Sequence, residues 1–169
     1  MHQSNYFFLK FVTLLLILFF VELLSITQKG VIIPWTQFLA EMSSYIVRLF
    51  DADAISQGII LRDSKSGFGV AIQPGCNGIE AIIVLIAAMV AYPASIKAKI
   101  NGIFFGFIAV QLLNVLRIIS LFYLGQWNQT AFDWAHQYVW QALIMLDVLI
   151  VFVLWIRMSR NTKGEEHVK

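Results

Sequence analysis

The sequence predicts an all-α integral membrane protein with about four transmembrane helices, plus an amphipathic helix and a short β-hairpin in the first outer loop. Hydrophobic residues make up 59% of the 169 residues and charged residues 13%, against roughly 45–50% and roughly 25% in soluble domains. Apolar runs long enough to cross a bilayer also recur along the chain,. A soluble domain of this size cannot bury so much apolar surface. We therefore expect a single membrane domain over residues 1–169.

Charge and cysteine content exclude several classes of function. The net charge is +2 and no basic stripe is present, so we expect no nucleic-acid partner,. The single cysteine, Cys76, excludes an internal disulfide, a CxxC redox centre and a thiolate zinc cluster,.

The apolar runs define the predicted spans: residues 6–26, 79–94, 100–124 and 138–158. The first run is too long for a signal peptide and lacks a cleavage site, so we expect it to be retained. Lys97 and Lys99 crowd the loop between the second and third spans, whereas residues 125–137 contain no Lys or Arg. The positive-inside rule then places both termini, the tail 159–169 included, in the cytoplasm and the segment 27–78 outside.

The outer segment 27–78 has its own predicted structure. Apolar residues recur at helical spacing over 35–50, which predicts an amphipathic helix flat on the outer membrane surface or over the bundle,. The polar face expected for it consists of Thr36, Gln37, Glu41, Ser43, Ser44 and Arg48. Two apolar runs, 59–61 and 68–72, flank a polar turn that ends in Gly67 and predict the hairpin,.

Three reactive side chains converge at the outer ends of the spans. Cys76 directly precedes the second span and His136 the fourth. Arg117 lies 17 residues into the third span, about 25 Å from its cytoplasmic start. Topology thus brings a thiol, a guanidinium and an imidazole to one membrane depth.

Each of these residues also has a structural interpretation. Cys76 can be a small buried hydrophobe, but Asn77 as N-cap with Glu80 three residues later predicts a helix start that favours a thiolate,. We interpret Glu80 as a capping carboxylate in preference to a catalytic one. His136 can be an interfacial histidine of an aromatic belt, or the proton carrier of a Cys–His pair.

Arg117 is costly inside a span, unless it snorkels to the headgroups. Its spacing favours the bundle interior, because polar residues recur every third position at Gln111, Asn114, Arg117 and Ser120. There it could pair with the thiolate or hold a developing oxyanion. Glu22 could neutralise Arg117 or be a solvated end residue. Asp147 lies about 16 Å deeper than His136 and is interpreted as protonated or internally paired.

The motifs resemble those of the exosortase/archaeosortase family. Residues 75–79 read Gly-Cys-Asn-Gly-Ile, residues 114–118 read Asn-Val-Leu-Arg-Ile, and a histidine precedes the last span. Members of that family are multi-pass membrane proteins with Cys, Arg and His in this order, and they act as sortase-like cysteine transpeptidases. The resemblance covers residues 75–137, and the size and layout are most similar to the small exosortase H type.

The resemblance implies that Cys76 is the nucleophile, Arg117 the assisting cation and His136 the acid/base, with no metal or organic cofactor. We expect these three to be supported by Asn77, Gly78, Glu80 and Asn114. The implied partners are membrane-anchored exported proteins whose C-terminal signal has a short motif, one span and a basic tail. The implied location is the cytoplasmic membrane, with the site facing the periplasm.

Two other functions stay open at this point. A non-catalytic subunit of an export or polysaccharide assembly would tolerate the loss of the thiol. A thiol acyltransferase would use the same Cys–His chemistry on a lipid acyl chain.

Overall fold

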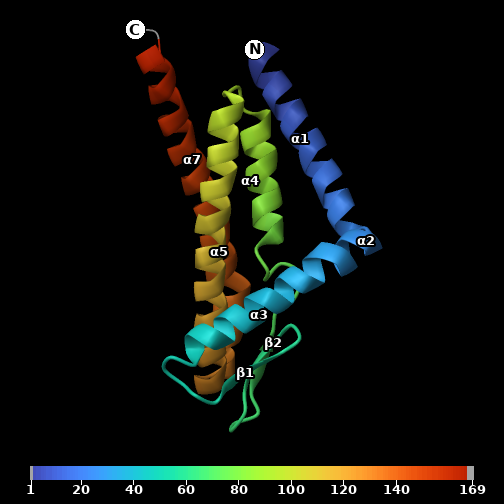
Figure 1. Cartoon of the computed structure of the whole chain (residues 1–169), viewed down its shortest axis with the longest axis vertical. Coiled ribbons are helices and arrows are strands. Elements are labelled where there is room, and N and C mark those ends of the chain that lie inside the picture. Colours follow the sequence, from blue (N-terminus) through green and yellow to red (C-terminus); the bar gives the residue numbers. More distant parts are fainter. Residues whose placement is uncertain (1, 167–169) are drawn as a thin grey trace.

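The computed structural model describes the backbone of residues 2–166 and the side chains of residues 5–159 (Figure 1). Its long axis is formed by the helices α1 (His2–Leu23), α4 (Ile79–Ala91), α5 (Ile96–Trp127) and α7 (Trp140–Glu166). Helix α3 (Ile33–Val47) lies across the bundle near the end of α4, and the described chain ends, His2 and Glu166, lie at the end away from the sheet. The predicted mostly helical architecture is confirmed.

Three stretches of the described chain are long and apolar enough to cross a membrane: Asn5–Leu23, Ile96–Trp127 and Gln129–Ser159. Helix α4, expected as a span over 79–94, has only 13 residues. That is about 20 Å at 1.5 Å per residue, whereas a hydrocarbon core is roughly 30 Å thick. The helix is shorter than predicted because Tyr92, the residue before Pro93, is already extended,.

A tight junction connects α4 to α5. The Ser95 hydroxyl caps α5 by accepting from the Ala98 N–H at 3.3 Å. Lys99 donates to the carbonyl of Val90 at 2.8 Å, which satisfies one of the last backbone acceptors of α4,. As a result α5 begins at Ile96, four residues earlier than predicted, and returns along α4.

The predicted amphipathic helix is confirmed as α3, which follows α2 (Ser25–Thr27) and a π-helical turn, η1 (Gln28–Ile32). The predicted polar face is partly wrong, because the buried residues are Thr36, Leu39, Ala40, Ser43, Ser44 and Val47. Phe38 and Tyr45 are 50% and 70% exposed. Small and hydroxyl side chains let α3 pack closely on the protein, while Phe38 and Tyr45 point outward.

The outer segment also contains an antiparallel sheet in the order β1 (Ala54–Gln57), β2 (Ile60–Asp63), β3 (Gly69–Ala71). Strands β2 and β3 confirm the predicted hairpin. Asp63 shapes its turn, because its Oδ1 accepts from the N–H groups of Lys65 and Ser66, both at 2.7 Å,. Strand β1 was not predicted, since it contains a single β-branched residue, Ile55,.

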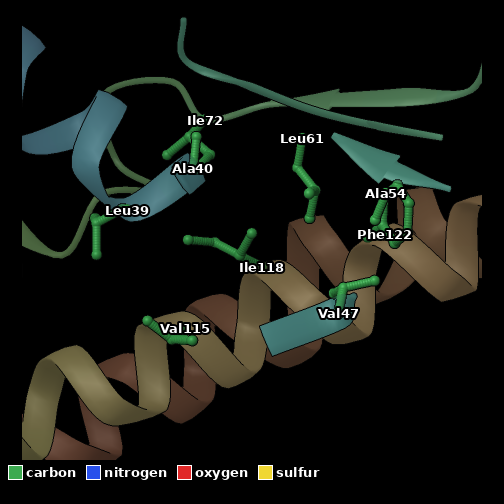
Figure 2. Packing of buried hydrophobic residues seen from close by; sticks show 9 residues of the cluster. All are labelled: Leu39, Ala40, Val47, Ala54, Leu61, Ile72, Val115, Ile118 and Phe122. Atoms are coloured by element: carbon green, nitrogen blue, oxygen red, sulfur yellow. The ribbon is translucent and has the colours of Figure 1, made fainter. Parts of the chain in front are cut away.

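Two hydrophobic clusters hold these parts together. The outer cluster joins α3, the sheet and the outer half of α5 (Figure 2), through Leu39, Ala40, Val47, Ala54, Leu61, Ile72, Val115, Ile118 and Phe122. The inner cluster joins α4, α5 and α7, with Leu85 and Met89 at its centre. Cys76 packs at the edge of the outer cluster, next to the beginning of α4.

Candidate active site

The single cysteine lies in the loop between β3 and α4. Its backbone N–H donates to the carbonyl of Gln73 at 2.9 Å, which closes a turn over the Pro74-Gly75 pair. The thiol is partly buried against the outer cluster. The loop therefore holds Cys76 where the sheet meets the helical bundle.

His136 lies beside this thiol although it is 60 residues away in the sequence. Its Nε2 is 3.3 Å from the Cys76 Sγ. The imidazole stacks on the ring of Phe132, with centroids 5.7 Å apart and planes 14° apart. His136 lies in a π-helical turn, η2 (Ala135–Val139), between α6 (Gln129–Trp134) and α7. Such turns are frequent at functional sites, because they re-aim a side chain within a continuous helix.

Arg117 completes the cluster from α5. The Cys76 Sγ accepts from one guanidinium NH₂ group at 3.3 Å, and the Gly75 carbonyl accepts from the other at 3.0 Å. Arg117 is only 2% exposed, so its head points into the protein and does not snorkel to the lipid headgroups. The predicted pairing of Arg117 with Cys76 is therefore present in the structure.

Asn77 anchors the cysteine loop to two helices. Its carbonyl accepts from the indole N–H of Trp35 and from the Gln111 amide, both at 3.3 Å. Its side chain donates to Thr36 at 3.3 Å and accepts from the Ile79 N–H at 3.1 Å. The prediction of Asn77 as the N-cap is wrong, because the N-cap is Gly78, although the Asn77 side chain accepts from the first N–H of the helix.

Glycine is required at position 78 by both the backbone conformation and the neighbouring side chain. Its φ of +76° lies in the left-handed region, which costs other residues about 1–3 kcal/mol. A Cβ at this position would lie 2.8 Å from the amide nitrogen of Gln111. The Gly78–Gln111 contact lets α5 approach the loop closely enough for Arg117 to reach the thiol.

The contacts of the acidic residues differ from those predicted. Glu80 was expected to bond back to the N-cap, but its carboxylate accepts from the Gly75 N–H on the other side of Cys76. Glu22 is buried and interacts electrostatically with Glu80. Among the described residues Glu22 forms no ion pair with Arg117. The ion pair found there joins Lys65 and Asp53. Asp147 is half-buried in α7, within the membrane-spanning stretch.

The predicted polar stripe of α5 faces the interior, since Gln111, Asn114 and Arg117 are all buried. Asn114 is completely buried, yet neither atom of its amide has a hydrogen-bond partner within the described part of the chain. The structure therefore does not bond Asn114 to the cysteine loop. It places the amide one helical turn from Arg117, on the same face of α5,.

Burial raises the pKa of the Cys76 thiol above its ordinary value. The charge of Arg117 opposes this rise, and the carboxylate of Glu80 adds to it. The raised pKa favours the thiol form, whereas the helix start was expected to favour the thiolate. A neutral thiol beside an imidazole requires the histidine to take the proton as the sulfur attacks.

Two cavities lie on either side of this loop. One, of about 150 Å³, is bounded by Cys76, Arg117, His136 and the strand residues 69–73. The other, of about 560 Å³, is a mostly apolar groove between α1, α4 and α7, and it reaches Gly75 and Gly78 at one end. The cysteine loop separates a small cavity beside the sheet from a long groove along the bundle.

Several supporting contacts were not predicted from the sequence. The tethers of Asn77 to Trp35 and Gln111 join residues at least 34 positions apart, so no local pattern marks them. The stacking of Phe132 on His136 was signalled only by their spacing of four residues, which places both on one helix face,.

Comparison with known families supports the resemblance noted from the motifs. The family description "Transmembrane exosortase (Exosortase_EpsH)" matches residues 4–156 of this chain. No curated protein and no solved structure gives a match. The family match covers most of the chain, and the described part contains apolar helices long enough to span a bilayer. The chain is therefore a multi-pass membrane protein and a member of the transmembrane exosortase family.

Proposed function

We propose that this protein is a membrane-embedded cysteine transpeptidase that cleaves a C-terminal sorting signal of exported proteins. The observation that carries the proposal is the meeting of the Cys76 thiol with His136 and Arg117, each within 3.3 Å. A Cys–His pair is the arrangement that thiol acyl transfer requires. Membership of the exosortase family agrees with it.

In the first half-reaction, the Cys76 sulfur attacks the carbonyl carbon of the scissile peptide bond while its proton passes to His136. The negative charge that develops on the carbonyl oxygen is stabilised by the Arg117 guanidinium. The C–N bond then breaks, and His136 gives its proton to the leaving amine. The exported protein is left as a thioester on Cys76, and the C-terminal sorting signal departs with the new amine.

In the second half-reaction, an acceptor nucleophile attacks the thioester and His136 takes its proton. The tetrahedral intermediate collapses, the C–S bond breaks and the thiol of Cys76 is re-formed with the proton held by His136. Water as the acceptor gives hydrolysis, and an amine or hydroxyl gives transfer.

The apolar groove supports the proposal that the substrate is anchored in the membrane. It is lined by Phe7 and Phe11 of α1, by Ala81 and Ala88 of α4, and by residues of α7. Small residues on α4 let another helix approach closely. We propose that the single span of the sorting signal enters this groove laterally, because the groove ends beside Gly75, next to the nucleophile.

The proposed orientation places the site on the periplasmic side of the cytoplasmic membrane. Both described chain ends lie at the end of the bundle opposite the sheet (Figure 1). Lys97 and Lys99, at the beginning of α5, also lie at the end with the termini. The positive-inside rule assigns that end to the cytoplasm.

The test is capture of the acyl-enzyme during co-expression with an exported protein that carries a motif, a span and a basic tail. We expect wild type to mature this substrate and to form a hydroxylamine-sensitive adduct at Cys76. Cys76→Ala removes both, and His136→Ala slows maturation by about 10²–10⁴-fold. Lys65→Ala, in the distant turn of the sheet, is the control and keeps both.

The mass of the adduct separates the alternatives. A polypeptide on Cys76 agrees with transpeptidation, and a fatty acyl group identifies a thiol acyltransferase. Full maturation by Cys76→Ala would show that the protein is a non-catalytic subunit.

A further inference from the structure

Strand β3 has one paired edge and one open edge. Two backbone hydrogen bonds flank the pairing of β3 with β2: the Asp63 N–H donates to the Phe68 carbonyl and the Ile72 N–H donates to the Ile59 carbonyl, both at 2.9 Å. In an antiparallel pair, residues alternate between facing the partner strand and facing away. With Leu61 opposite Val70, the backbone groups of Gly69 and Ala71 therefore point away from β2.

The other outer edge of the sheet is covered. The outward carbonyl of Ala54 in β1 accepts from Arg48 Nε at 2.6 Å and from the Ser44 hydroxyl at 3.4 Å, both from the end of α3. No such partner caps Gly69 or Ala71 among the residues that the structure describes. Natural sheets usually protect their edges, because an open edge pairs readily with another strand.

The open edge lines the catalytic cavity. Residues 69–73 form one wall of the cavity that Cys76, Arg117 and His136 bound on the other sides. Gly69 and Ala71 are exposed and small, so a second backbone can approach to the strand spacing of about 4.8 Å. A chain paired with this edge would lie beside the thiol.

We propose that the open edge of β3 binds the extended segment around the scissile bond as an added strand. This inference rests on the proposed function and names how its peptide substrate is held. The N–H and C=O groups of Gly69 and Ala71 pair with alternate residues of the substrate, which fixes the scissile carbonyl opposite Cys76. Strand addition of this kind recognises the main chain, and side-chain pockets add selectivity.

The test compares two electrophiles on the full-length protein in membranes. One is ethyl vinyl sulfone, and the other is an acetylated tetrapeptide of alternating threonine and alanine that ends in a vinyl sulfone. Two to three backbone hydrogen bonds predict inactivation about tenfold or more faster with the peptide. N-methylation of its amides one at a time should remove this gain at every second position.

Two proline variants form a matched pair. Ala71→Pro deletes an outward N–H on the open edge, where proline is tolerated, and should reduce the peptide's gain about fivefold. Ser56→Pro deletes an outward N–H of β1, on the far edge, and should retain the gain. Reaction of each variant with ethyl vinyl sulfone reports whether its site is intact.

The outcomes separate the two proposals. An N-methylation pattern without alternation, or an equal gain in wild type and an intact Ala71→Pro, overturns strand addition while leaving the enzyme assignment in place. If ethyl vinyl sulfone modifies wild type no faster than His136→Ala, the thiol is not activated and the proposed function fails. A tenfold faster reaction of the peptide, lost on N-methylation at every second amide, supports binding at the open edge. This result is measured on wild type, so it does not depend on the folding of a variant.

Discussion

Arg117 makes two hydrogen bonds in the site that have different consequences. The bond to the Gly75 carbonyl fixes the cysteine loop, and the bond to Cys76 places the positive guanidinium beside the sulfur. That charge opposes the effect of burial on the pKa of the thiol. In the proposed reaction a negative charge forms beside this buried arginine, which would account for an arginine near the end of a span.

Arg117→Gln should raise the pKa of Cys76 further, because it removes the charge that opposes burial. Alkylation requires the thiolate, so the rate profile with iodoacetamide should move to higher pH. Arg117→Lys keeps the charge and should move it less. A profile that stays in place, or moves to lower pH, in Arg117→Gln would contradict this account.

The three reactive residues were predictable from the sequence because their depth follows from the topology of the helices. Their contacts were less predictable, since these depend on surfaces that only the folded chain brings together. The left-handed Gly78 against Gln111 is one example. The turn η2 that aims His136 is another, because one extra residue in a helical turn leaves no local signature,.

At the scale of elements, α5 is the common support of both hydrophobic clusters and of Arg117. Its inner half contacts α7 closely at Gly102, where a Cβ would lie 2.2 Å from the indole nitrogen of Trp155. That nitrogen donates to the Ala98 carbonyl at 2.8 Å. The Trp155–Ala98 bond and the glycine together set the distance between the two helices.

Gly102→Ala should destabilise the protein by about 1–3 kcal/mol, because the new methyl group displaces a buried tryptophan. Gly30→Ala is the matched control, since no atom lies within 4 Å of its added Cβ, and it should be neutral or slightly stabilising. The measurement is thermal unfolding of both variants in one detergent. Equal unfolding temperatures for the two would disprove this packing argument.

The elements also show what sequence patterns do not predict. Helical spacing located α3 but not its buried face, because Ser43 and Ser44 pack against the protein while Phe38 faces outward. A soluble helix buries its large apolar side chains, whereas a helix at a bilayer has apolar surroundings on both sides. The alternation of apolar and polar residues therefore does not say which side is protein.

At the scale of the whole molecule, the described chain ends, His2 and Glu166, lie at the end of the bundle away from the sheet that precedes the cysteine loop (Figure 1). This polarity can be measured with single cysteines introduced into Cys76→Ala. Ser64→Cys, in the exposed turn between β2 and β3, should react with a membrane-impermeant maleimide on the periplasmic side. Lys97→Cys, at the exposed beginning of α5, should react only after permeabilisation. The reverse pattern would invert the proposed orientation.

The shortness of α4 has a consequence for the membrane itself. A 13-residue helix falls about 10 Å short of a hydrocarbon core of roughly 30 Å, and hydrophobic mismatch of this kind thins the surrounding lipid. A mostly apolar groove runs beside this short helix. We therefore expect the bilayer to be thinnest next to Cys76, so that water and headgroups reach the thiol while the rest of the bundle stays in hydrocarbon.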